Sequence, residues 1–348
     1  MIVKDYQFDL LTRMFAEGAN PMEPEIRAPE IRGVLRWWFR VLGGFRGDTR
    51  SVRDQELALF GGVFGDKPTR SKLVVRALKH TSLVPFHNDA EGLDAGVNTA
   101  LGYLLFPMRG VQRGFFQPNK PQNEAFRVSL VWNGAEEDFV KIDALMAVFG
   151  QLGSLGFRSR KCMGALAFHG KPPMRIDEAL EFFANPQAID VHELPENQAG
   201  EPLTSVEKCV KGLAVWYKQW RSYGPEGGRN TFAPGFEKAS IDHDIGLGDR
   251  RGESAVRPAL GLPIIQRYSH VRMTNTWNPS DGDRFASPVI LRPYRTAQGG
   301  FKALVVFVDA MKWSEGATVK IGPKVVPVSN ELYMCMKEDT RLRRAQLD

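Results

Sequence analysis

The stretch PEIRGVLRWWFRVLGG, residues 29–44, predicts an amphipathic helix near the start of the chain. Four large apolar side chains in it are spaced four, three and four residues apart, so a helix brings them onto one stripe. They are Ile31, Leu35, Trp38 and Leu42. Pro29 suits a first helical turn, and Gly43 and Gly44 end the pattern. We therefore expect a helix that packs one face against a core.

The same helix carries a row of arginines beside its apolar stripe. Arg32, Arg36 and Arg40 are each four residues apart, so their guanidinium groups share one ridge. Such a ridge suits bidentate contacts with phosphates, and Trp37, which is off the stripe, could stack on a base. A solvated basic face, with Trp37 covering a neighbouring element, fits the spacing equally well.

The segments around this helix predict a ferredoxin-like first domain. We expect a strand within 4–15, the helix, strands within 70–79 and 124–133, a helix within 137–153, and a loop leading into a strand within 154–170. The order strand, helix, strand, strand, helix, strand is that of a split βαβ unit.

A segment rich in Pro, Asn and Glu, residues 171–205, is expected to join the first domain to a second one. We place the boundary near residue 172, which gives domains 1–172 and 173–348, the second with a Gly- and charge-rich insertion near 224–256. The second domain should contain a long helix at 205–223, strands within 260–268, 286–295 and 301–310, and a last amphipathic helix at 330–345.

The composition favours a globular protein with a polyanionic partner. The 348 residues are 43% hydrophobic and 25% charged, with a net charge of +6 and a pI near 9.2. No apolar run approaches the roughly 18 residues of a spanning helix, and the first residues lack a signal-peptide core, so we expect a cytoplasmic protein without membrane contact. Cys162, Cys209 and Cys335 are too far apart for a Cys-x-x-Cys metal site.

A second basic segment, GQLGSLGFRSRKCMG at 150–164, is rich in glycine. Glycines allow a backbone to approach a phosphate, while Arg158, Arg160 and Lys161 could neutralise its charge. A Gly-rich hairpin with exposed arginines is the alternative. The segment does not match a Walker loop, and GLGDRRG at 246–252 misses the dinucleotide-binding spacing, so no nucleoside triphosphate site is predicted.

Other candidate groups are weaker. Four residues of the insertion, Asp242, His243, Asp244 and Asp249, could form a metal cluster or an acid/base pair, but no second His or Cys group completes a ligand set, so a solvated loop is favoured. His169 follows a predicted strand and is a candidate general base. Arg284 and Arg292 flank a Ser-Pro bend, which fits either a nucleic-acid strip or ordinary edge-strand charge.

Four blocks together resemble the first-numbered Cmr subunits of type III-B CRISPR effector complexes, a family within the RAMP superfamily. They are EIRAPEIRGVLRWWFRVLGG at 25–44, ELALFGGVFGDKPTRSKLVV at 56–75 with its Glu-x-x-x-Phe-Gly segment, GSLGFRSRKCMGAL at 153–166 with its Arg-x-Arg loop, and ASPVILRPYR at 286–295. The third block departs from the family by continuing as Cys162-Met163-Gly164-Ala165, where a run of small residues is expected.

The resemblance implies an α+β protein of two ferredoxin-like (RRM/RAMP-type) domains packed together. It also implies a non-catalytic subunit in antiviral defence, without metal or other cofactor, that holds guide RNA near its 3′ end, target RNA and other Cmr subunits. The residues expected to contact RNA are Arg32, Arg36, Trp37, Arg40, Arg158, Ser159, Arg160, Lys161, Arg284 and Arg292.

Two other functions stay open from the sequence. One is a metal-independent endoribonuclease that processes CRISPR repeat RNA, since RAMP proteins of that kind share the fold and commonly depend on a histidine. His169 and His243 are then the candidates. The other is a protein-binding module whose aromatic side chains serve a subunit interface.

Overall fold

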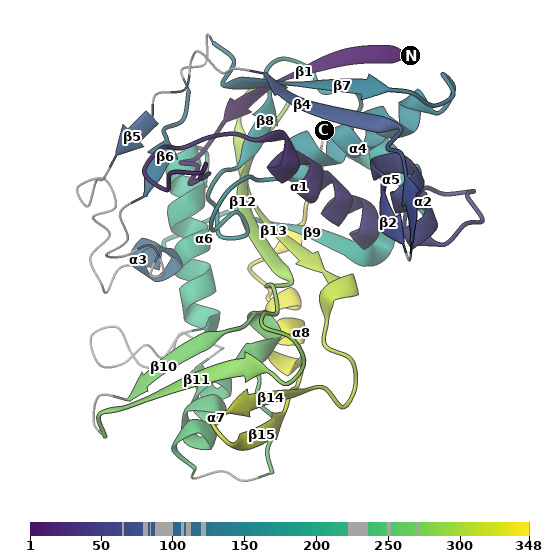
Figure 1. Cartoon of the computed structure of the whole chain (residues 1–348). Coiled ribbons are helices and arrows are strands. Elements are labelled where there is room, and N and C mark those ends of the chain that lie inside the picture. Colours follow the sequence, from purple (N-terminus) through teal and green to yellow (C-terminus); the bar gives the residue numbers. More distant parts are fainter. Residues whose placement is uncertain are drawn as a thin grey trace.

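The computed structural model describes residues 1–64, 66–78, 83, 85–87, 100–105, 108, 113–119, 123–221, 236–248, 252–268 and 271–347. The described strands form three four-stranded sheets and two short two-stranded ones. Figure 1 shows the first large sheet at the top, the second in the middle and the third at the bottom.

The first large sheet and its helices form a ferredoxin-like unit. In chain order the elements are β1 (Ile2–Leu10), α1 (Ala28–Val41), β4 (Leu73–Leu78), β7 (Phe126–Trp132), α4 (Phe139–Leu152) and β8 (Leu166–Phe168). The sheet order is β4-β7-β1-β8, and every neighbouring pair is antiparallel. This is the split βαβ arrangement, so the predicted order of elements is confirmed.

The predicted apolar stripe on α1 is confirmed. Ile31, Leu35 and Trp38 are each at most 1% exposed and belong to the core under the first sheet. The helix stops because Gly43 and Gly44 adopt left-handed backbone angles, with φ of 75° and 76°, which glycine tolerates best.

Shorter elements extend this unit. They are α2 (Val52–Phe60), β2 (Gly62–Phe64), β3 (Lys67–Thr69), β5 (Pro85–His87), α3 (Ala100–Leu104) and β6 (Gly114–Phe116). Helix α2 begins at Ser51, whose hydroxyl accepts a hydrogen bond from the Asp54 N–H at 3.1 Å, and it packs beside α1.

A second ferredoxin-like unit has the same topology. Its elements are β9 (Ile189–Leu194), α6 (Val206–Arg221), β12 (Val289–Arg295), β13 (Phe301–Val308), α8 (Glu331–Lys337) and β16 (Arg343–Arg344), with the sheet order β12-β13-β9-β16. Two such units packed together confirm the predicted fold class. Helix α5 (Ile176–Glu181) precedes β9 and packs on α4 of the first unit, while the boundary near residue 172 stays a prediction.

Two insertions into the second unit build the third sheet. The first insertion contributes α7 (Phe236–Leu247), β10 (Ile264–Tyr268) and β11 (Met273–Pro279), and the second contributes β14 (Thr318–Ile321) and β15 (Lys324–Pro327). The sheet order is β10-β11-β14-β15, and it has its own small core around Trp277. The sequence predicted neither β11 nor the β14–β15 hairpin.

The segment predicted to be a solvated loop is helical where the structure describes it. Asp242 lies in α7, is 1% exposed and pairs with the Arg257 guanidinium at 3.0 Å. Its carboxylate also accepts the N–H groups of Val256 and Arg257, each at 2.8 Å. The loop prediction for Asp242 was therefore wrong, whereas Asp249 and residues 222–235 lie outside the described residues.

The last helix is shorter than predicted. It ends at Lys337 instead of continuing to residue 345, because Asp339 draws the chain into a turn. The Asp339 carboxylate accepts the indole N–H groups of Trp216 and Trp220, each at 2.8 Å. The chain after this turn is then free to pair Arg343–Arg344 with β9 as the fourth strand.

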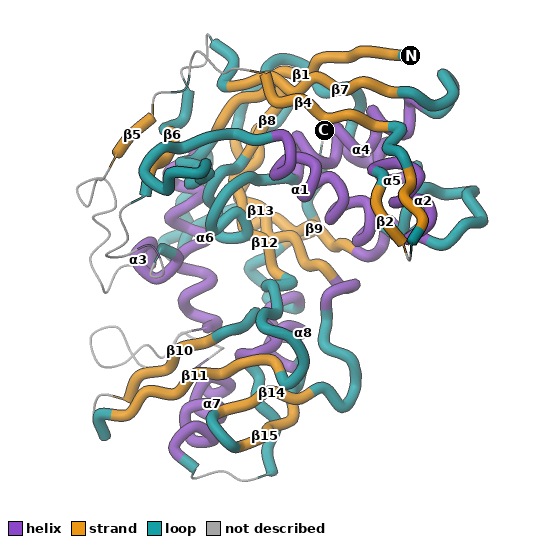
Figure 2. Tube along the Cα trace, viewed as in Figure 1, coloured by secondary structure: helices purple, strands orange, loops and turns teal. Residues whose placement is uncertain are grey.

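The two ferredoxin-like units meet along the Gly-rich segment and β12. Leu291 of β12 accepts the Cys162 N–H at 2.9 Å and donates its own N–H to the Arg160 carbonyl at 3.0 Å. Figure 2 shows β12, β13 and β9 lying between the first and the third sheet. No described helix combines the length and the apolar character that crossing a lipid bilayer requires.

Candidate nucleic-acid interface

The outer face of α1 carries the predicted arginine row. Arg36 donates from Nε to the Glu56 carboxylate at 2.5 Å, and Arg40 lies 3.8 Å from the same carboxylate, while the two arginine side chains are 36% and 54% exposed. Glu56 belongs to α2 and is itself only 8% exposed. One carboxylate therefore orients two guanidinium groups and leaves the face with an excess of positive charge.

Arg32 differs from the other two arginines. Its Nε is buried and has no hydrogen-bond partner in the described structure. The neighbouring Gly33 is exposed, and a Cβ built on it would meet no atom within 4 Å. The surface at Gly33 is therefore open, and Arg32 has a buried hydrogen-bond donor for which the described protein supplies no acceptor.

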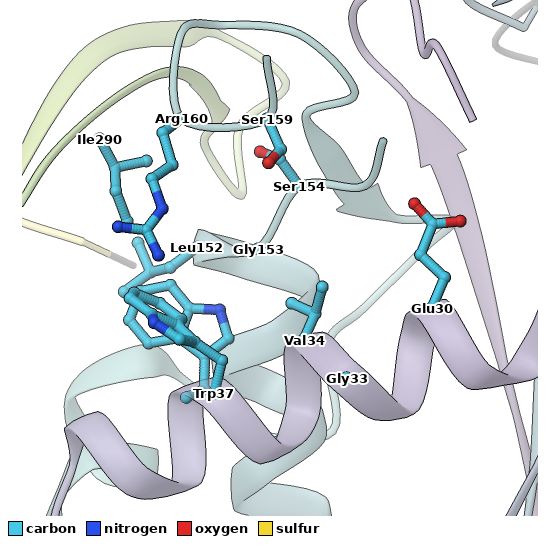
Figure 3. A pocket seen from close by; sticks show the side chains of 11 residues that line it. Glu30, Gly33, Val34, Trp37, Leu152, Gly153, Ser154, Ser159, Arg160 and Ile290 are labelled. Carbon is cyan, nitrogen blue, oxygen red and sulfur yellow. The ribbon is translucent and has the colours of Figure 1, made fainter. Parts of the chain in front are cut away.

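Trp37 forms one wall of a pocket of about 190 Å³ between α1 and the Gly-rich segment (Figure 3). The Arg160 guanidinium lies 4.5 Å from the centre of the Trp37 ring, and Trp38 packs against the same ring edge-on at 4.8 Å. Trp37 is half-buried, so part of the indole still faces outward. The pocket thus combines an aromatic wall with a cation.

The polar end of this pocket is formed by Glu30 and two serines. Glu30 accepts the Gly156 N–H at 2.6 Å, and burial raises the pKa of its carboxyl group. The Ser154 hydroxyl is buried without a partner in the described structure, and Ser159 lies beside it (Figure 3). An unsatisfied buried hydroxyl is a hydrogen-bonding group available to a ligand.

The predicted basic side chains of the Gly-rich segment point into the protein. Arg158 donates to the Leu104 carbonyl at 2.7 Å, and Arg160 donates to the Ser287 carbonyl. Lys161 is 4% exposed and donates to the Val289 carbonyl at 3.2 Å. Burial lowers the pKa of Arg160 to about 10 and that of Lys161 to about 8. Arg160 and Lys161 hold the second unit against the first, whereas Arg158 binds α3 of the first unit.

Arg292 and Arg284 do not share a surface. Arg292 is 0% exposed and donates to the Gly153 carbonyl at 2.6 Å and to the Leu166 carbonyl, and burial lowers its pKa to about 9. This arrangement leaves no Arg292 nitrogen at the surface for an RNA phosphate. Arg284 is exposed, in the loop before β12.

The two candidate histidines lie on different units. Nδ1 of His169, just after β8, is 2.9 Å from the Asp9 carboxylate. His243 lies in α7, with its ring 4.9 Å from that of Tyr268. Among the residues that the structure describes, no three His, Cys, Asp or Glu side chains gather as a metal would require.

The structure therefore brings part of the predicted set together. Trp37, Ser159 and Arg160 line one pocket, while Arg36 and Arg40 share the Glu56 carboxylate on the arginine row of the same helix. Two acidic residues that organise these groups, Glu30 at the pocket and Glu56 at the arginine row, were missed. The signal for Glu56 was present, because it is the first residue of the Glu-x-x-x-Phe-Gly segment.

A family model matches the first half of the chain, and two relatives each match about half of its length. The family model for the RAMP superfamily matches residues 7–167. The CRISPR system Cmr subunit Cmr1-1 of Pyrococcus furiosus is 30% identical over 171 residues, which are 48% of this chain and 47% of that protein. Cmr1-2 of the same organism is 31% identical over 174 residues, 46% of this chain and 92% of the relative.

The fold is also similar over the whole chain. The crystal structure of Cmr1 from Pyrococcus furiosus, in its apo form, aligns with a TM-score of 0.56 at 14% identity and covers 99% of this chain and 98% of that one. In sequence, the match spans about half the length of Cmr1-1 and most of the length of Cmr1-2.

Proposed function

Because the chain belongs to the Cmr1 family of the RAMP superfamily, we propose that it is a non-catalytic RNA-binding subunit of a type III-B CRISPR (Cmr) effector complex. Its RNA is the guide RNA near the 3′ end, the target RNA, or both, and its other partners are the remaining Cmr subunits. The names of the relatives support the assembly role.

The observation that carries RNA binding is the outer face of α1. It combines the cations Arg32, Arg36 and Arg40 with the half-buried ring of Trp37. Guanidinium groups at helical spacing neutralise successive phosphates, and an aromatic ring stacks on a base without regard to its sequence. We therefore assign the backbone contacts to the arginines and one stacking contact to Trp37.

The Gly-rich segment has an indirect role in this proposal. Its cations bind carbonyl groups of the protein, so the segment fixes the position of Arg160 over Trp37 and thereby the shape of the pocket. Of the ten residues predicted to contact RNA, Lys161 and Arg292 are left out of the proposed interface because both are buried.

The test is a charge reversal on α1 with a matched control. Arg32→Glu combined with Arg40→Glu should weaken the retention of labelled single-stranded RNA about tenfold or more. It should also make the dependence of log affinity on log salt shallower by about 1.4, or about 0.7 for each phosphate that is no longer bound. Arg36 is kept because it is hydrogen-bonded to Glu56.

The control makes the same change of charge elsewhere. Lys208 and Lys211 are exposed on α6 of the second unit, and Lys208→Glu with Lys211→Glu should leave the salt slope within error of the wild type. Equal losses in the two double variants would show that total charge, and not α1, determines binding. Discrete RNA fragments that copurify with the protein and vanish in His169→Ala would instead favour the endoribonuclease.

A further inference from the structure

A second and larger pocket lies where the two ferredoxin-like units meet. Its volume is about 730 Å³, and it shares no lining residue with the pocket beside Trp37. Its walls come from the turn after β8, from α5, and from the β12–β13 hairpin. Pockets of this size at a junction between domains are typical places for small-molecule ligands.

Asp9 organises the polar end of this junction pocket. It is 4% exposed, and its Oδ1 lies 2.9 Å from Nδ1 of His169 and 2.9 Å from the Asn119 amide nitrogen. Its Oδ2 accepts from the Arg295 guanidinium at 2.6 Å. The charge of Asp9 is therefore satisfied within the protein, and the carboxylate holds His169 and Arg295 in fixed orientations at the pocket wall.

The groups that remain available suit an anion. With Nδ1 on Asp9, the other ring nitrogen of His169 is left for a ligand. Arg295 uses one N–H on Asp9 and one on the Phe168 carbonyl, so three of its five N–H groups have no partner in the described structure. Lys171 is exposed at the same wall and makes no ion pair with a described carboxylate.

The charges around the pocket balance one another. Arg175 also lines the pocket but is hydrogen-bonded to Asp177 at 2.9 Å. Counted with Asp177, the cations Lys171, Arg175 and Arg295 equal the carboxylates Asp9, Asp177 and Glu178, so the unused N–H donors, and not the net charge, favour an anion. Arg, Lys and His side chains that line one pocket offer the charge-assisted hydrogen bonds that bind a phosphate.

The remaining lining has room for more than a phosphate. Pro172 and Met174 are half-buried and present apolar surface, and the buried Tyr294 lines the same pocket. An apolar wall beside a cationic end fits a ring system joined to a phosphate. We propose that the junction pocket binds a nucleoside monophosphate group, with the phosphate on His169, Lys171 and Arg295 and the ring along Pro172 and Met174.

Two sources of this group share the same chemistry, namely a free mononucleotide and the phosphorylated end of an RNA strand. The test uses the full chain with 13C-labelled histidine, in which His169→Gln identifies the His169 signal among those of the six histidines. Adenosine 3′-monophosphate and adenosine 5′-monophosphate should each be tried. At least one of them should shift this signal saturably, whereas adenosine, which lacks the phosphate, should not.

Lys171→Glu is the main variant because Lys171 is exposed and its replacement leaves the Asp9 network intact. It should weaken nucleotide binding about tenfold or more, as expected when a charge-assisted hydrogen bond is removed. Lys208→Glu, with the same change of charge on α6, should leave binding unchanged.

A short RNA with a terminal phosphate, compared with the same RNA ending in a hydroxyl, separates the two sources. Tighter binding of the phosphorylated RNA than of the mononucleotide assigns the pocket to an RNA end, and the reverse order assigns it to a free nucleotide. Equal shifts with adenosine, or unchanged binding in Lys171→Glu, would overturn the proposal. The α1 double variant should keep nucleotide binding, so this proposal and the proposed RNA face fail independently.

Discussion

Buried basic side chains are the residue-level feature that most distinguishes this protein. Arg158, Arg160, Lys161 and Arg292 make no ion pair with any carboxylate in the described structure, and each donates instead to main-chain carbonyls. Burying a charge is costly unless its hydrogen bonds are satisfied. These four side chains offset part of that cost because each donates to at least one main-chain carbonyl. The carbonyls that Arg160, Lys161 and Arg292 bind lie in the other unit, so these three positions require the two units to be docked.

Three of the buried or half-buried cations converge on Tyr217. The Arg221 guanidinium donates to the Tyr217 hydroxyl at 3.1 Å, and the Lys161 ammonium lies 3.8 Å from the centre of its ring. Burial alone would raise the pKa of Tyr217, but the positive charges of Arg221, Lys161 and Arg158 outweigh it and lower the pKa to about 7. Tyr217 should therefore ionise well below the ordinary range of a phenol.

The prediction is a tyrosinate step in the near-ultraviolet absorbance near pH 7 that Tyr217→Phe removes. Because the folded pKa lies below the unfolded value of 10.0, ionisation of Tyr217 stabilises the fold fully above pH 10. This contribution is lost as the pH falls through about 7. The free energy of unfolding of the wild type, relative to Tyr217→Phe, should thus increase from pH 7 to pH 10.

Tyr333→Phe is the control for this titration. Burial and the nearby Asp309 carboxylate raise the pKa of Tyr333, so its removal should leave the step near pH 7 in place. If the step persists in Tyr217→Phe, the phenol is neutral and the buried cations repel one another without an anionic partner.

At the scale of elements, the Gly-rich segment forms a close backbone turn inside the first unit. Gly164 has a φ of +63°, donates its N–H to the Arg13 carbonyl at 2.8 Å and accepts from the Leu155 N–H at 3.0 Å. A Cβ on Gly164 would collide with the Leu155 carbonyl oxygen. The glycine is therefore required by this turn, whether or not the segment meets RNA.

Gly164→Ala should lower the free energy of unfolding by about 3 kcal/mol, because the left-handed strain of about 1–2 kcal/mol adds to the collision with Leu155. Gly170→Ala is the matched control, since Gly170 has a φ of +89° but a Cβ there meets no atom within 4 Å. Gly170→Ala should lower the free energy of unfolding only by the left-handed strain of about 1–2 kcal/mol. Urea denaturation measures both, and equal costs would show that the backbone near Gly164 relaxes.

The sequence predicted elements better than it predicted which elements cover one another. The stripe of α1 and its glycine end were predictable because both signals are local to one helix. The burial of Arg292 was not, since strand alternation says which residues share a face but not that both faces of β12 are covered. The β14–β15 hairpin was missed because its strands, at four residues each, are too short to show a period.

The candidate interface was partly predictable because part of its pattern is local to one helix. Helical spacing was enough to place Arg32, Arg36 and Arg40 on one ridge. It could not show that Glu56 from α2 binds two of them, because that contact depends on how two helices pack. Likewise, His169 was a lone candidate in the sequence, and only the fold brings Asp9 and Arg295 to it.

At the scale of the whole molecule, the two ferredoxin-like units have the same topology and share buried apolar surface. The core under the first sheet includes Ile290 and Tyr294 of β12, so apolar surface of both units is buried together. Arg292 lies between these two residues and donates across the junction to carbonyls of the first unit. The two units should consequently unfold in a single cooperative transition.

Arg292→Ala should uncouple that transition. The Leu166 carbonyl would lose its Arg292 donor inside the junction, and the Gly153 carbonyl would keep only the long hydrogen bond from the Leu166 N–H at 3.4 Å. A buried carbonyl left unsatisfied costs about 1–3 kcal/mol. We expect the free energy of unfolding to fall by about 3 kcal/mol and the thermal transition to broaden or to split in two. Arg344→Ala, at an exposed position of the second unit, should change neither. A single transition of unchanged width in Arg292→Ala would place the coupling in the apolar surface around Ile290 and Tyr294, which the substitution leaves buried.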